Sequence, residues 1–252
     1  MIKKNSIFSI LMMLIVALLF LQCSEKQRVS KIIEHDFVDF GLPSGTLWAV
    51  CNVGANNEWE SGDYFAWGEI FAKTNYDRTN YKFFEPYRQL TKYCSNSAEG
   101  KNAYTDALTI LQPADDAATA IWGRKWQMPN VEQWRELAVN CYWVWVENYA
   151  DTLACGFVVF KAKFDADKGK VTKTKSADYN YSDVHIFLPA AGYHYGENFY
   201  DDNLRGYYWT NQLYTQFPLS AYNIVFDTTG ILPDCDYGSR DDGLAVRAIR
   251  LR

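Results

Sequence analysis

Residues 37–55 have the sequence FVDFGLPSGTLWAVCNVGA, in which a turn is followed by an apolar strand. Pro43, flanked by Gly41 and Gly45, favours a tight turn, because proline fixes one backbone torsion and glycine adopts positive ones. Ser44 is therefore assigned to the turn and not to a nucleophile. Residues 46–51 are rich in aromatic and β-branched side chains, which is typical of a strand. We expect this turn and strand to open a folded domain.

Strand-like stretches recur along the chain, at residues 62–67, 158–164, 185–193, 207–213, 221–227 and 244–251. In residues 158–164, apolar side chains alternate with Lys161 and Lys163, as a half-buried strand requires. The turn signal Asp167-Lys168-Gly169 follows, so we expect a hairpin over residues 158–176.

Two helices are expected. After Asn130, apolar residues recur at helical spacing up to Cys141, and Asn130 with Gln133 forms a capping-box pattern. A second helix is expected over residues 114–122, with Asp115 and Asp116 in its first turn, where carboxylates favour the positive end of the helix dipole. Strands and helices together predict an α+β fold.

The N-terminus has the pattern of an export signal. Lys3 and Lys4 precede an apolar run over residues 7–21, which is shorter than the roughly 18 residues of a membrane span and ends at Gln22-Cys23. A cysteine at this place resembles the lipobox of bacterial lipoproteins, so we expect Cys23 to be acylated. The alternative is ordinary signal cleavage nearby. The expected organisation is a signal peptide (1–22), a lipidated cysteine with a flexible tether (23–36) and one domain (37–252).

The net charge of the chain limits the partners that it is expected to bind. The 252 residues carry a net charge of −5, which lacks the basic footprint that a nucleic-acid backbone needs. Without Lys3 and Lys4 the acidic excess grows, so membrane attachment is expected through the lipid anchor alone. We expect an exported protein of the cell envelope, an outer-membrane lipoprotein.

Five cysteines follow the signal, at positions 51, 94, 141, 155 and 235. Disulfides persist in exported proteins, but the odd number leaves at least one thiol unpaired and the pairing open. A metal site is not expected, because no C-x-x-C pair is present and His35, His185 and His194 lack ligand spacing.

Several motifs share their order with one family. Besides residues 37–55, they are GDYFAWGE at 62–69, LTKYC at 90–94, DDAA at 115–118, WQMP at 126–129, IFLPAAGY at 186–193, Tyr208-Trp209 and Val246-Arg247. This series resembles the Fibrobacter succinogenes major paralogous domain, a family of exported bacterial proteins. The resemblance implies a C-type-lectin-like fold of twisted antiparallel sheets with two main helices, distantly related to formylglycine-generating and sulfatase-modifying proteins. It also implies that the last strand pairs near the start of the domain and that Arg247 is a structural, paired arginine.

Catalytic patterns are missing from the sequence. It contains no phosphate loop, dinucleotide-binding turn, zinc-protease helix or nucleophile elbow. The oxidase relatives need paired cysteines near the C-terminus, where only Cys235 stands, so an oxidase is a remote alternative. The calcium motifs of sugar-binding lectins are not matched either. Asp201, Asp202, Asp241 and Asp242 are assigned to solvated loops, and a structural ion held by them is the alternative. We expect no enzyme, no cofactor and no metal.

Two stretches, 193–216 and 234–242, combine aromatic rings with carboxylates and amides. Such surfaces suit sugar rings, and tyrosine and arginine also anchor protein interfaces. The candidate ligand-binding residues are Tyr195, Tyr200, Asp202, Asn203, Tyr214, Asp234, Tyr237 and Arg240. We expect a lipid-anchored, non-catalytic surface protein that binds a glycan or a protein; the alternative is a structural or adhesive subunit of an envelope or pilus assembly.

Overall fold

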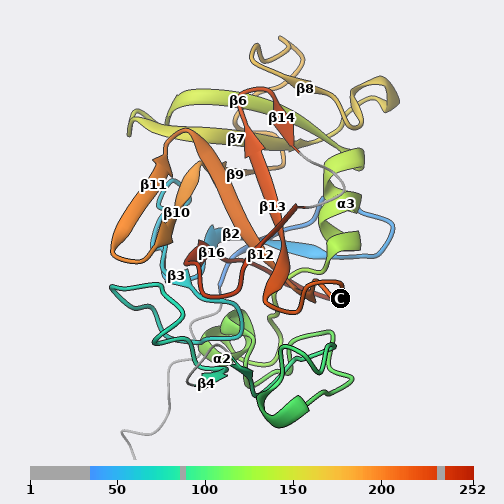
Figure 1. Cartoon of the computed structure of the whole chain (residues 1–252). Helices are drawn as coiled ribbons and strands as arrows, with labels where there is room; N and C mark the ends of the chain where they lie inside the picture. The colour runs from blue at the N-terminus through green and yellow to red at the C-terminus, as the bar shows by residue number, and fades with distance from the viewer. Residues whose placement is uncertain (1–34, 86–88, 232–235) are drawn as a thin grey trace, which may run out of the picture. The chain divides into compact units, whose positions relative to one another are not determined.

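In the part of the chain that the structure describes, most regular elements are β-strands, and two α-helices accompany them, which places the chain in a mixed α+β class as predicted (Figure 1). The computed structural model describes residues 35–85, 89–231 and 236–252. These residues belong to one compact unit, His35–Arg252. Cys23, Asp234 and Cys235 lie outside the described residues, and so does the expected signal sequence.

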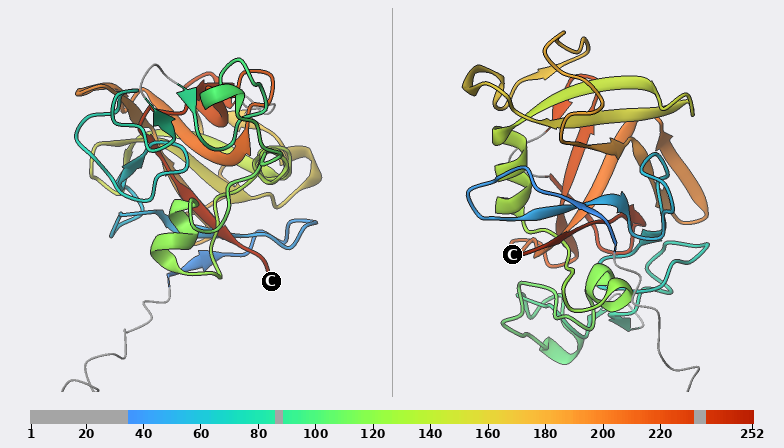
Figure 2. Two further views of the ribbon diagram at one scale, coloured as in Figure 1. Left: turned by 60° about the horizontal axis from the view of Figure 1, so that its bottom comes forward. Right: turned by 180° about the vertical axis from the view of Figure 1, so that it is seen from behind.

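A three-stranded sheet joins the two ends of the domain. Its order is β1 (Phe37–Val38), β2 (Leu47–Asn52) and β17 (Arg247–Arg250), all antiparallel. The turn before β2 is the predicted one, closed by a hydrogen bond from Gly45 N to Leu42 O of 2.9 Å. β2 and β17 run side by side in views from other directions (Figure 2). The last strand thus pairs near the domain start, as expected.

A four-stranded sheet has the order β8 (Val171–Thr172), β6 (Cys141–Tyr149), β7 (Ala154–Lys161) and β9 (His185–Pro189). The hairpin here is formed by β6 and β7, while β8 pairs in parallel with β6. The expected hairpin over residues 158–176 is therefore wrong. Apolar and polar residues do not alternate over Val158, Val159 and Phe160, because all three are buried. The sheet is therefore covered on both faces at this point.

The largest sheet carries the residues of the candidate site. Its central path is β11 (Asn198–Asp202), β10 (Ala191–Tyr195), β12 (Arg205–Leu213), β13 (Ser220–Asp227) and β14 (Gly230–Ile231). Three strands are attached to this path: β15 (Asp236–Ser239), β16 (Leu244–Ala245) and β3 (Tyr64–Phe65). A separate two-stranded sheet pairs β4 (Phe84–Glu85) with β5 (Gln89–Leu90), and short 3-10 turns cover Lys101–Ala103 and Asp165–Asp167.

Both predicted helices form. In α3 (Val131–Asn140) the capping box is complete, since Asn130 accepts from Gln133 N and the Gln133 side chain accepts from Asn130 N. α2 (Ala117–Trp122) begins three residues later than predicted, with Asp116 as its N-cap. Asp115 therefore does not lie in the first turn.

Asp115 instead forms an ion-pair cluster. Its carboxylate pairs with Lys82 and Lys92, both at 2.6 Å, and accepts from the hydroxyl of Tyr93. Burial alone would raise the pKa of Asp115, but these hydrogen bonds lower it. The cluster holds the segment around α2 against the residues that precede β4 and follow β5.

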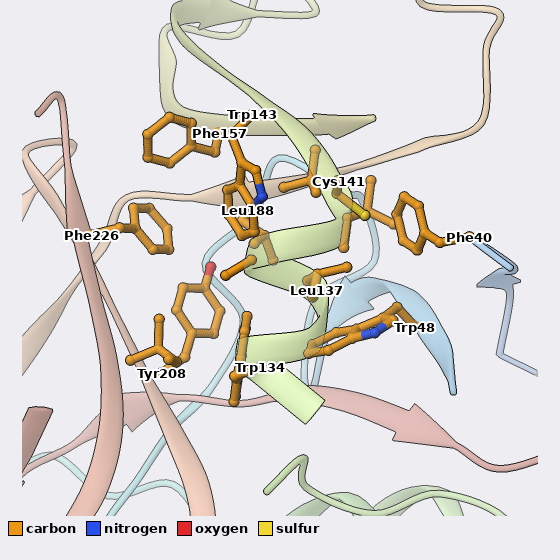
Figure 3. Packing of buried hydrophobic residues seen from close by; sticks show 14 of the residues in the cluster. Phe40, Trp48, Trp134, Leu137, Cys141, Trp143, Phe157, Leu188, Tyr208 and Phe226 are labelled. Atoms are coloured by element: carbon orange, nitrogen blue, oxygen red, sulfur yellow. The ribbon is translucent and has the colours of Figure 1, made fainter. Parts of the chain in front are cut away.

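The main core lies where α3 meets the sheets. Trp134 of α3 packs edge-on against Trp48 of β2, with ring centroids 4.6 Å apart, and tilts against Tyr208 of β12 at 5.7 Å (Figure 3). Two further clusters of buried residues surround Trp67 with Trp209, and Tyr142 with Phe187. Aromatic side chains thus fill the junctions between the sheets, which fixes the strands that carry the site.

Candidate functional site

Four of the predicted ligand-binding residues lie on or beside the hairpin of β10 and β11. Tyr195, at the end of β10, and Tyr200, in the middle of β11, are 56% and 41% exposed. Asp202 ends β11 and is also exposed, opposite Ala191 in the register. Asn203 follows with a positive φ, and its Oδ1 accepts a hydrogen bond from Cys155 N at 2.9 Å. The hairpin thus presents two tyrosines to solvent, while Asn203 ties it to β7.

Three tyrosines form a continuous ladder across this sheet. Tyr193 stacks on Tyr200, its partner in the register, with ring centroids 5.4 Å apart, and contacts Tyr207 of β12 at 4.9 Å. The hydroxyl of Tyr207 donates to Asp201 at 2.7 Å. Burial and the hydrogen bond to Asp201 raise the pKa of Tyr207 to about 12, so its hydroxyl stays protonated at neutral pH. We call Tyr193, Tyr200 and Tyr207 the tyrosine ladder.

A surface pocket of about 360 Å³ begins where the ladder ends. Tyr207 and Arg205 line one side, and β13, β14 and the first residue of β15, Asp236, line the rest. Arg205 and Asp227 face each other across β12 and β13, with Nε and Oδ2 3.6 Å apart. Hydrogen bonds from Thr229 lower the pKa of Asp227, so it is ionised at neutral pH. The pocket therefore offers a charged pair above an apolar base of Val225, Phe226 and Ile231.

Tyr214 and Tyr237, predicted from separate stretches, come together. Their rings stack with centroids 4.1 Å apart and planes 7° from parallel. β15 makes this contact possible, because it pairs Tyr237 with Tyr222 of β13, and Tyr222 also contacts Tyr214 edge-on. Tyr237 is 48% exposed and directly follows Asp236 of the pocket. The second predicted stretch thus adjoins the first.

Arg240 occupies a different environment from the other candidates. Its side chain is fully buried, and its guanidinium donates to the Tyr81 hydroxyl at 2.9 Å and to three backbone carbonyls, of Lys92, Tyr93 and Pro218. It also lies over the ring of Trp67 at 4.8 Å. With these donors in use inside the protein, Arg240 holds the loop after β15 in place and does not face the pocket.

The loop after Arg240 holds two adjacent acids, a buried Asp241 and a partly buried Asp242, whose burial the sequence did not indicate. Asp241 is 1% exposed, which corrects the expectation of a solvated loop; it accepts from Ser239 and lies 3.5 Å from Arg78. Burial, and then the charge of Asp241, raise the pKa of Asp242 to about 7. Asp242 also helps to raise the pKa of Tyr193, so the pair lies near the tyrosine ladder.

Some expectations concern metals, thiols and the membrane. Within the described ranges, no group of three or more histidine, cysteine, aspartate or glutamate side chains is arranged to hold a metal ion. Cys51, Cys94, Cys141 and Cys155 are free thiols. None of the helices in the described part of the chain combines the length and hydrophobicity that a membrane span requires.

Comparison of the chain with protein-family models, with curated proteins and with solved structures finds no match in any of the three.

Proposed function

We propose that this chain is a non-catalytic, lipid-anchored protein of the cell envelope whose domain binds a glycan at the tyrosine ladder and the adjoining pocket. The observation that carries the proposal is the continuous series of ring contacts from Tyr200 through Tyr193 to Tyr207, which ends at the pair of Arg205 and Asp227. Sugar rings place their C–H groups against aromatic faces, while charged side chains hydrogen-bond their hydroxyls. Anchoring through Cys23 and export to the outer membrane complete the proposal.

The fold that we propose is C-type-lectin-like, within the family of the Fibrobacter succinogenes major paralogous domain. Two features support this proposal: the sheet that pairs β2 with β17 and so joins the ends of the domain, and the two helices beside sheets in which most strand pairs are antiparallel. In this family the proposed ligand surface lies just before the final strand, where β12, β13 and β15 form the pocket.

A binding array of glycans, with and without calcium, tests the function. We expect binding by the purified protein that falls about tenfold or more in Tyr200→Ala, because hot-spot aromatics carry most of the energy of an interface. Tyr104→Ala, which removes a partly exposed tyrosine far from these strands in the sequence, is the matched control. Retained binding in Tyr200→Ala, or equal loss in Tyr104→Ala, contradicts the site.

A structural or adhesive subunit is the second candidate, and one observation favours it. Apolar and aromatic side chains are exposed together on the β10–β11 hairpin and the turn after it, namely Tyr195, Phe199, Tyr200 and Leu204. Such exposed groups mark protein interfaces. A folded protein that binds no glycan but crosslinks to one envelope protein through this hairpin supports the subunit and contradicts the glycan site.

A further inference from the structure

A second pocket, of about 460 Å³, opens beside the hairpin that joins β6 to β7. The side chains that give it its character are Glu58, Tyr149, Asp151, Tyr181 and His185. None of them lines the pocket at Arg205 and Asp227. This pocket is therefore distinct from the proposed glycan site.

Three aromatic rings form one wall of this pocket. The ring centroids of Tyr149, Tyr181 and His185 lie 6.0 to 6.4 Å from one another, and the ring planes meet at 64° to 78°. A cation is attracted to a ring when it lies within about 6 Å of the centroid. Rings this close together allow one cation to interact with more than one of them. Tyr181 is 53% exposed, so its ring is accessible from solvent.

Two carboxylates supply negative charge. Glu58 is half-buried and Asp151 is exposed, and in the described part of the chain neither forms an ion pair with lysine or arginine. The buried Arg247 interacts with Glu58 only through its charge, because its guanidinium donates to Asn52 and to backbone carbonyls. A carboxylate partly removed from water favours a cationic partner more strongly than one in bulk solvent.

Both ring nitrogens of His185 lie within hydrogen-bond distance of a partner. Its Nδ1 lies 2.8 Å from the carbonyl oxygen of Asp183, which places the proton on Nδ1. Nε2 lies 3.1 Å from the hydroxyl oxygen of Tyr149, within hydrogen-bond distance. Burial, and a hydrogen bond to Glu58, raise the pKa of Tyr149, so this hydroxyl stays protonated. The pocket thus combines aromatic faces, two carboxylates and an imidazole.

We propose that this pocket binds an organic ammonium group, carried by an amino sugar or by a lysine side chain. The carboxylates of Glu58 and Asp151 hold the charge, and the rings of Tyr181 and Tyr149 contact the ammonium and its neighbouring carbon atoms. An anion is excluded by the same carboxylates. A neutral group brings no positive charge to balance the two carboxylates, so the site discriminates by charge.

Calorimetric titration of the purified full-length protein tests the proposal with two pairs of probes. Glucosamine is compared with N-acetylglucosamine, and Nα-acetyl-lysine amide with its Nε-acetylated form. We expect at least one amine to bind about tenfold more tightly than its neutral partner, and the amine that binds identifies the source. Added salt weakens this binding, because the attraction is electrostatic.

Variants then locate the site. Tyr181→Ala and Glu58→Gln should each weaken amine binding about tenfold, while Tyr181→Phe keeps the ring and the affinity. Phe71→Ala, at a 77% exposed aromatic, and Glu132→Gln, at an exposed carboxylate, are the matched controls and leave binding unchanged. Thermal unfolding by circular dichroism confirms that each variant is folded.

Three results overturn the proposal. They are equal binding of the charged and neutral probes, no binding of either amine at about 10 mM, and amine binding that folded Tyr181→Ala and Glu58→Gln retain in full.

Discussion

Arg247 donates from its Nε to the Oδ1 atom of Asn52, and this 2.7 Å hydrogen bond links β17 to β2, at opposite ends of the domain. The same guanidinium donates to the carbonyl oxygens of Ala49, Val50 and Phe187. Its side chain is fully buried. One residue therefore connects the terminal sheet with β9 of the four-stranded sheet, which agrees with the structural role expected for it.

Arg247→Lys should destabilise the domain by about 3 kcal/mol or more, because a lysine ammonium has three donors at a single point and leaves buried acceptors unpaired. Urea unfolding measures the change. Arg124→Lys, the same substitution at an exposed arginine, is the control and should shift the free energy of unfolding very little. Equal shifts in the two variants would argue against the linking role of Arg247.

Two glycines of the β10–β11 hairpin differ in the space that a side chain would have. Gly192 and Gly196 both have a φ of +60°, but a Cβ at Gly192 would lie 2.3 Å from Tyr200 O, whereas a Cβ at Gly196 meets nothing within 4 Å. Gly196→Ala should cost about 1 kcal/mol, from the left-handed backbone alone. Gly192→Ala should cost more, because the strands must separate at Tyr200.

Urea unfolding measures both variants, and near-ultraviolet circular dichroism reports on the tyrosine ladder. We expect the tyrosine signal to change in Gly192→Ala and to persist in Gly196→Ala, since Tyr193 and Tyr200 stack beside Gly192. Equal destabilisation with an unchanged tyrosine signal would mean that the close approach to Tyr200 O does not constrain the hairpin.

The sequence indicated most strands and both helices, because turn residues or caps separate them. It missed β6, which begins at Cys141 directly after α3, without a glycine or proline between them. It also suggested the wrong partner for β7. Both faces of β6 and β7 are buried around Trp143 and Val144, so the polar alternation that marks a strand is missing there.

The sequence predicted residues of the site only where their contacts join residues that are close together in the chain. Tyr193 and Tyr200 pair within one hairpin, and both lie in the stretch selected for its aromatic residues. Arg240 looked like part of a charged loop, but its partners Tyr81 and Tyr93 come from a distant part of the chain, which no local pattern reveals. The sequence missed the second pocket for the same reason, because Glu58 and Tyr181 are far apart in the sequence and come together only in the folded domain.

Asp242 should make the stability of the domain fall as the pH rises. Its folded pKa is about 7, whereas an unfolded aspartate titrates near a pKa of about 4. Between these values the folded state binds more protons, so the free energy of unfolding decreases from about pH 4 to about pH 7 and then levels off. The neighbouring charge of Asp241 adds to this cost, and Arg78 offsets part of it.

Asp242→Asn removes the titrating group and should flatten this slope. At pH 8 the variant should be more stable than the native protein by roughly 1 to 3 kcal/mol, a value reduced for the solvent that reaches this partly exposed side chain. At pH 4 the two should be nearly equal, because Asp242 is then protonated in the folded state. Urea unfolding at several pH values measures the slope, with Asp178→Asn at an exposed aspartate as the control. An unchanged slope in Asp242→Asn would show that another group controls the pH dependence.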